Sequence, residues 1–89
     1  MRRRDEFGAV YRALGERIAQ ERARRSLSQR ELAELTGTTQ SAIARLEGGS
    51  RAPRLDTLLR VANALDCALE LDLRPRTTIE RGSNDVDDR

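Results

Sequence analysis

Residues Ser28 to Gly49, SQRELAELTGTTQSAIARLEGG, decide the fold of this 89-residue chain. Ser28 and Glu31 have the spacing of a capping box, in which the serine hydroxyl accepts from the amide of residue 31 and the glutamate accepts from the amide of Ser28. Gly37 is placed to end the helix that follows, because glycine adopts the left-handed conformation at little cost. The stretch therefore begins with a short, well-bounded helix.

A second short helix follows directly. Thr39 is a good N-cap residue, the helix is predicted from Gln40 to about Glu47, and Gly48 and Gly49 close it. Two short helices joined by a tight turn that contains glycine are typical of a helix-turn-helix unit.

The same stretch contains the apolar residues that such a pair needs. Leu32 and Leu35 are expected to face inward from the first helix, and Ala33 is small enough for the two helices to touch. Ile43 and Leu46 are expected to anchor the second helix. The full set, together with both caps, is a specific signal for the motif.

The second helix presents a polar face on the side opposite its apolar anchors. At 100° per residue, Gln40, Ser41, Ala44 and Arg45 lie within an arc of about 140°. A carboxamide, a hydroxyl, a methyl and a guanidinium are groups that match base edges in a DNA major groove. The alternative is an ordinary solvated helix face.

The flanking sequence predicts the rest of an all-α domain. Apolar residues recur at helical spacing from about Phe7 to Arg24 and again from Leu55 to Leu65. The glycines at 8 and 15 weaken the first of these helices. After residue 66 the period changes to two, which predicts a half-buried strand with its leucines on one face: Leu69, Leu71 and Leu73.

The predicted organisation is a basic N-terminal arm (1–6), a helix-turn-helix domain (7–66), a dimerisation strand (67–75) and a flexible tail (76–89). The fold class is all-α, a bundle of four to five helices with a short C-terminal strand. The strand either pairs with its copy in a second subunit or packs back on its own helices. The arginines at 2–4 either enter a DNA groove or belong to a disordered start.

Composition narrows the classes of function. The chain has no histidine and a single cysteine, Cys67, so zinc-finger chemistry, an internal disulfide and histidine-dependent catalysis are excluded. We expect no enzymatic activity, no cofactor and no metal site. No apolar run approaches the roughly 20 residues that span a bilayer, so a cytoplasmic, nucleoid-associated location is the expectation.

The charge is unevenly distributed. Residues 1–60 hold 13 arginines and 8 acidic residues, whereas residues 61–89 hold 4 arginines and 7 acidic residues. A basic front half is what attraction to phosphate requires. The candidate phosphate contacts are two residues at helix N-termini and two in the loop that follows the helix pair: Gln29, Thr39, Arg51 and Arg54. Each arginine has the alternative of being an ordinary surface residue.

These motifs resemble the Xre/Cro family of phage-repressor-like helix-turn-helix domains. The likeness covers about Leu14 to Leu65 and is carried by SQRELA (28–33), GTTQS (37–41), Ile43 and RLEGG (45–49). It implies that Gln40, Ser41 and Arg45 read bases and that Gln29 and Thr39 hold the phosphate backbone. It also implies a structural ion pair between Arg22 and Glu47.

Three positions depart from the family pattern. Arg54 stands where many members cap the fourth helix with Ser or Thr, which predicts a weaker cap. Ser50 stands where many members have a lysine that is expected to contact phosphate, so that contact depends more on Arg51 here. Ala44 reads little by itself.

The segment from Leu65 to Pro75 resembles HipB-type antitoxins, in which a strand after the last helix pairs with its copy. Together the two resemblances imply a homodimeric repressor of an inverted-repeat DNA operator, which regulates its own gene. The alternative is an antitoxin that neutralises a partner toxin and represses its own operon. Double-stranded DNA and a second copy are the expected partners, a toxin is the alternative partner, and no membrane is expected.

Overall fold

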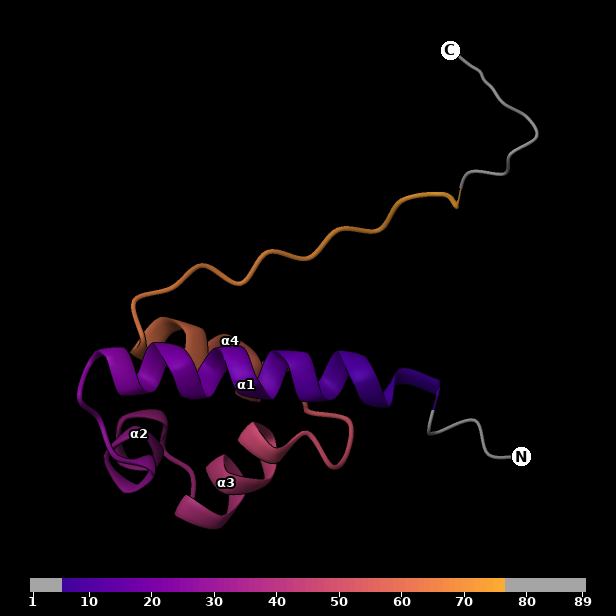
Figure 1. Cartoon of the computed structure of the whole chain (residues 1–89). Coiled ribbons are helices and arrows are strands. Elements are labelled where there is room, and N and C mark those ends of the chain that lie inside the picture. The colour runs from indigo at the N-terminus through magenta and orange to yellow at the C-terminus, as the bar shows by residue number, and fades with distance from the viewer. Residues whose placement is uncertain (1–5, 77–89) are drawn as a thin grey trace.

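The computed structural model describes residues 6–76 and contains four helices in that range (Figure 1). These are α1 (Gly8–Arg24), α2 (Gln29–Thr36), α3 (Gln40–Gly48) and α4 (Leu55–Ala64). The predicted all-α fold is confirmed, with helix ends within one residue of those expected. The arginines at 2–4 and nearly all of the predicted tail lie outside the described residues.

Both caps of the helix pair form as the sequence predicts. The Ser28 hydroxyl accepts from the Glu31 amide at 2.9 Å, and the Glu31 carboxylate accepts from the Ser28 amide at 2.8 Å. Gly37 ends α2 with φ of 70°. The Thr39 hydroxyl accepts from the Ala42 amide at 3.0 Å, which caps α3. These bonds satisfy amide groups that the first turn of a helix leaves without partners.

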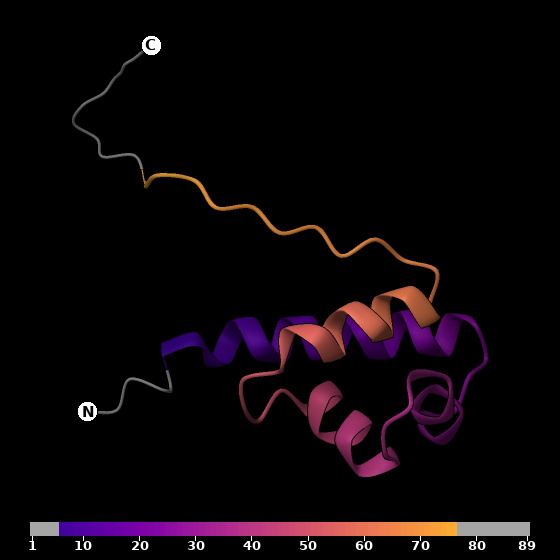
Figure 2. The same cartoon turned by 180° about the vertical axis from the view of Figure 1, so that it is seen from behind.

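The core lies where the four helices meet. It consists of six buried apolar residues: Ile18, Leu32, Ala33, Ile43, Val61 and Leu65. In Figures 1 and 2, α2 and α3 lie together on one side of α1. Each helix supplies one or two residues to the core, so the orientation of α3 depends on the whole bundle.

The prediction that Leu35 faces inward is wrong, because its side chain is 61% exposed. Leu32, Ala33 and Thr36 define the buried face of α2, and Leu35 lies about 110° away from the centre of that face. Thr36 takes the inner position although it is polar. Its hydroxyl is satisfied within the helix, where it donates to the carbonyl oxygen of Leu32 at 2.8 Å.

Two glycines allow α1 and the end of α3 to approach closely. A Cβ on Gly15 would lie 2.4 Å from the carbonyl oxygen of Glu47, and a Cβ on Gly49 would lie 2.5 Å from the Cα of Arg12. Gly49 also has φ of 67°, a conformation that favours glycine. Gly15 therefore contributes the contact between α1 and α3, whereas the sequence pattern indicated only a weak helix at this position.

Several apolar side chains of α1 and α4 and the residue before α1 remain exposed. Phe7 and Val10 at the start of α1 are 52% and 62% exposed, and Leu55 and Leu59 on α4 are 53% and 50% exposed. The N-terminal cap of α4 is weak, as expected, because the side chain of Arg54 makes no capping hydrogen bond. No helix in the described part of the chain is long and apolar enough to cross a membrane.

Residues 67–76 form an extended segment that leaves the bundle on the side away from α3 (Figures 1 and 2). Within the described residues the predicted strand has no partner strand, so no β-ladder forms. Cys67 and Leu69 are half-buried against the bundle, but Leu71 and Leu73 are 69% and 98% exposed. Packing back on the chain's own helices therefore applies only to the first residues of the segment.

Candidate nucleic-acid interface

The predicted base-reading residues all lie on the outer face of α3. Gln40, Ser41, Ala44 and Arg45 are exposed, whereas Ile43 on the inner side of the helix is fully buried in the core. The described residues of the chain leave this face uncovered, and its donors and acceptors point to solvent. An α-helix presented in this way has the dimensions to enter a DNA major groove.

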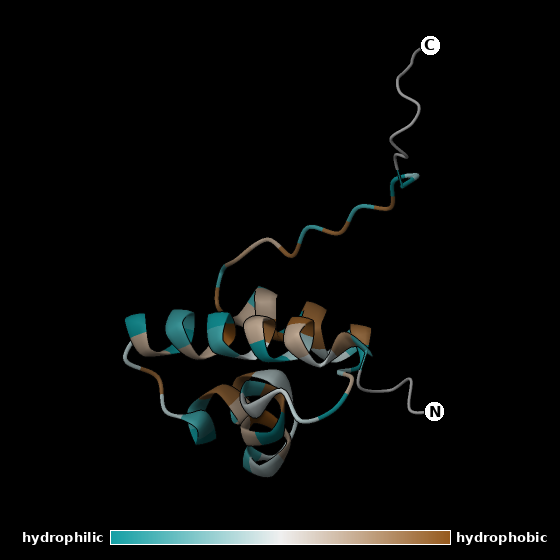
Figure 3. Cartoon of the chain, turned by 45° about the vertical axis from the view of Figure 1, so that its right-hand side comes forward, coloured by the Kyte–Doolittle hydropathy of each residue, from teal (hydrophilic) through white to brown (hydrophobic). Residues whose placement is uncertain are grey.

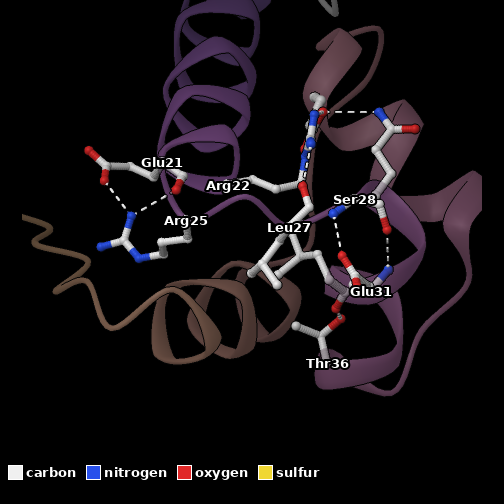
Figure 4. A network of polar contacts seen from close by, with 10 residues as sticks. Glu21, Arg22, Arg25, Leu27, Ser28, Glu31 and Thr36 are labelled. Carbon is white, nitrogen blue, oxygen red and sulfur yellow. Dashed lines mark hydrogen bonds and ion pairs between the residues drawn. The ribbon is translucent and has the colours of Figure 1, made fainter.

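The predicted ion pair between Arg22 and Glu47 is present, and it holds α3 against α1. The guanidinium donates to both carboxylate oxygens of Glu47, at 2.6 and 3.0 Å. It also donates to the carbonyl oxygen of Leu27 at 2.8 Å (Figure 4). A bidentate pair of this kind fixes orientation as well as distance. It joins α3 to α1 and so helps to set the angle at which α3 protrudes.

Glu47 is a charged group in a largely buried position, since only 7% of its side chain is exposed. Burial by itself would raise the pKa of Glu47, but hydrogen bonds from Arg22 and Gln29 outweigh that effect and hold the pKa below its ordinary value. The hydrogen bond to Glu47 in turn raises the pKa of Arg22 above its ordinary value. Both groups therefore stay charged at neutral pH.

Gln29 is the position where the sequence expectation and the structure differ most in detail. Its side-chain nitrogen donates to Glu47 at 3.0 Å, so the carboxamide joins α2 to α3. The sequence motif does not show this bond, because residues 29 and 47 come together only in the folded chain. The carboxamide keeps a second N–H besides the one bonded to Glu47, so both the side chain and the backbone amides at the start of α2 remain donors for the phosphate contact predicted at Gln29.

The other predicted phosphate residues are exposed. The Thr39 hydroxyl accepts from the Ala42 amide, and its hydrogen remains available for an outside acceptor. Arg51 is exposed in the loop before α4. Arg54 is also exposed, but it donates to the Asp56 carboxylate at 3.1 and 3.2 Å, which offsets part of its charge.

Folding brings three of these arginines together. A shallow groove between the end of α3 and the start of α4 is lined by Arg45, Arg51 and Arg54, with Pro53 and Thr57 among the other residues on its walls. A predicted base reader and both predicted loop arginines therefore share one positively charged surface. Their proximity does not follow from sequence spacing, since the first and the last of them are nine positions apart.

The sequence interpretation missed Arg30. It lines a second hollow together with Gln40, Ser28 and the glutamates at 31 and 34. Arg30 is exposed at the start of α2, in the same hollow as the predicted base-reading residue Gln40. Its position directly after Gln29 in the capping box is the signal that could have identified it.

The comparison with known families agrees with this geometry. A helix-turn-helix family model, HTH_3, matches residues 18–71. The chain belongs to this helix-turn-helix family. The HTH_3 family contains Xre and lambda-repressor-like transcriptional regulators.

The relatives of this helix-turn-helix protein are regulators. This chain is 41% identical over 66 residues to the HTH-type transcriptional regulator y4dL of Sinorhizobium fredii, and the match covers 74% of this chain. The chain spans about a third of the length of that relative, 33%.

Solved structures of other regulators share the fold. The restriction-modification controller protein C.AhdI from Aeromonas hydrophila has a TM-score of 0.67 at 34% identity, covering 70% of this chain and 90% of its own. The clp gene regulator ClgR from C. glutamicum has a TM-score of 0.63 at 29% identity, and the match covers 66% of this chain and 77% of that one. The P22 c2 repressor in complex with a synthetic operator has a TM-score of 0.59 at 31% identity, and the match covers 62% of this chain and 83% of that one.

Proposed function

We propose that this helix-turn-helix protein is a homodimeric transcriptional repressor that binds an inverted-repeat DNA operator, including one at its own gene. The observation that carries the proposal is the exposed face of α3, with Gln40, Ser41, Ala44 and Arg45 on one side and the buried Ile43 on the other. A similar chain, the P22 c2 repressor, was solved on an operator.

In this proposal each protomer inserts α3 into a major groove, and the two helices lie about 34 Å apart, one turn of DNA. Arg45 would contact guanine and Gln40 adenine. Amides at the start of α2, the Thr39 hydroxyl and Arg51 would hold phosphates. Arg54 would contribute less, since Asp56 competes for its guanidinium. A dimer bound over the promoter would exclude the polymerase.

Selection of bound DNA from a random pool tests the proposal. We expect two symmetric half-sites whose centres lie one helical turn apart. Enrichment of no sequence at moderate salt, or of a single unrepeated site, would refute the dimeric operator.

Two variants then distinguish a contact with bases from a contact with phosphates. Arg45→Ala should cost about 1–3 kcal/mol and relax selectivity at one base pair in each half-site. Arg51→Ala is the matched control, an exposed arginine expected to contact phosphate. It should weaken binding to all sequences alike and reduce the salt dependence by about one ion. If both variants kept wild-type selectivity at every position, Arg45 would not be a base-reading residue.

An antitoxin role is the second candidate, and the exposed leucines Leu71 and Leu73 are the observation that favours it. In that case the C-terminal segment would bind a toxin, and DNA binding would regulate the operon. Coexpression with the product of the neighbouring gene, followed by purification through a tag on this chain, tests this role. Copurification of the neighbour and relief of its toxicity would support it, and the absence of both would refute it.

A further inference from the structure

One of the three arginines that line the groove between α3 and α4 differs from the other two. Arg45 and Arg51 are exposed and form no ion pair with any residue that the structure describes. Arg54 does form one, with its Nε 3.1 Å from Oδ1 of Asp56 and its Nη2 3.2 Å from Oδ2. Figure 3 shows hydrophilic residues along the loop between α3 and α4, which forms one wall of this groove.

The contact between Arg54 and Asp56 uses the geometry by which a guanidinium binds phosphate. Two parallel N–H groups meet two oxygens, as in a bidentate arginine–phosphate pair. The hydrogen bond from Arg54 lowers the pKa of Asp56 below its ordinary value, so the carboxylate stays charged at neutral pH. The pair then has no net charge, whereas attraction to DNA depends on the positive charge that a protein brings to the phosphates.

The carboxylate has a second partner on α4. Oδ2 of Asp56 lies 3.4 Å from Nη2 of Arg60, one helical turn further along. The side chains of Arg54, Asp56 and Arg60 are 80%, 45% and 57% exposed. Exposed ion pairs are weak and exchange readily, because water and other ions compete for both partners. A DNA phosphate can therefore compete for Arg54, and Asp56 still has Arg60 as a partner when it does.

We propose that Asp56 is an intramolecular competitor of DNA phosphate, which holds Arg54 back and so lowers the affinity of the chain for DNA of any sequence. The inference rests on the DNA binding proposed above and adds a residue that sets its strength. Asp56 cancels one positive charge of the groove in each protomer. Because the competition concerns phosphates and not base edges, the preference among sequences should not change.

Asp56 also lies in the first turn of α4, where a negative charge stabilises a helix. A test must separate this effect from the competition for Arg54. Asp56→Asn removes the charge and keeps the size of the side chain, and urea unfolding of the variant measures any loss of stability.

A double-mutant cycle in the full chain tests the competition. Binding is measured by fluorescence anisotropy over a range of salt, with a duplex that carries the selected site and with a scrambled duplex. Asp56→Asn should tighten binding to both about two- to fivefold per protomer, the range of an exposed ion pair. The slope of log affinity against log salt should become steeper by about 0.9 per protomer, because Arg54 then neutralises one more phosphate.

The second arm of the cycle removes the arginine. In the wild-type background, Arg54→Ala should change the salt slope less than Arg51→Ala does, because the charge of Arg54 is already offset. Combined with Asp56→Asn, Arg54→Ala should abolish the whole gain in affinity. A gain that persists without Arg54 overturns the inference, since the charge of Asp56 would then act on DNA directly.

Glu34→Gln is the matched control for the loss of a negative charge. Glu34 is exposed, lines the polar hollow beside Gln40 and forms no ion pair within the described part of the chain. Any gain in affinity from Glu34→Gln should be the same with and without Arg54. A gain that depends on Arg54 as strongly as that of Asp56→Asn would overturn the specific role of Asp56.

The outcomes distinguish this inference from the function on which it rests. If the wild type binds its selected duplex but Asp56→Asn leaves affinity and salt slope unchanged, the repressor proposal stands and this inference fails. If the wild type binds neither duplex, both fail. Should Asp56→Asn prove unstable in urea, Arg54→Ala and Arg51→Ala decide, because both retain Asp56: equal changes in salt slope overturn the inference.

Discussion

Replacing Gly15 with alanine tests how α1 positions α3. Gly15 is in the middle of α1, where helix propensity alone predicts that alanine stabilises the fold by about 1 kcal/mol. The structure predicts the opposite sign. The new Cβ would lie 2.4 and 2.5 Å from the carbonyl oxygens of Glu47 and Leu46, which are backbone atoms and cannot rotate away.

The magnitude follows from the two opposing effects. Inserting a methyl into packed structure costs about 1–3 kcal/mol, and contact with rigid backbone places this case at the upper end. Subtracting the gain in propensity leaves a net loss of about 2 kcal/mol. For a domain of this size that corresponds to a decrease in Tm of about 10 °C. The displaced α3 should also weaken DNA binding.

The assay is urea unfolding followed by circular dichroism, at one protein concentration for all variants because a dimer's stability depends on concentration. Gly48→Ala is the matched control, since a Cβ there meets nothing within 4 Å. It should leave stability unchanged or raise it by up to about 1 kcal/mol. A Gly15→Ala protein as stable as the wild type would refute the close approach of α1 and α3.

Two further predictions concern the polar contacts around the helix pair. Ser28→Ala removes the cap of α2 and should cost about 1 kcal/mol in urea unfolding, whereas Ser50→Ala, at an exposed serine in the loop, should have no effect; equal values for both would contradict the capping box. Glu47→Gln should cost about 2 kcal/mol at pH 7, because Arg22 loses its ion pair. Since the folded pKa of Glu47 is lowered, its stabilising contribution is complete above the unfolded value of about 4.3 and is lost as the pH falls through the folded pKa. The difference between wild type and variant should therefore shrink below about pH 4, and a constant difference down to pH 2 would contradict the role of the charge.

The sequence by itself determined the helix pair and its outer face. The bonds of Ser28 with Glu31 and of Thr39 with the Ala42 amide join residues three apart. Helical spacing alone placed Gln40 and Arg45 on the exposed side of α3. Such features are local, so they follow from backbone geometry before any tertiary contact forms.

Tertiary structure alone decided the features that depend on distant residues. Leu35 is exposed because Thr36 takes the inner position on α2, and Gln29 is engaged by Glu47, which is 18 residues away. Gly15 serves as a contact between α1 and α3 only because the chain returns to it 32 residues later. Burial and charge pairing depend on which elements meet in space, and the local pattern of residues does not contain that information.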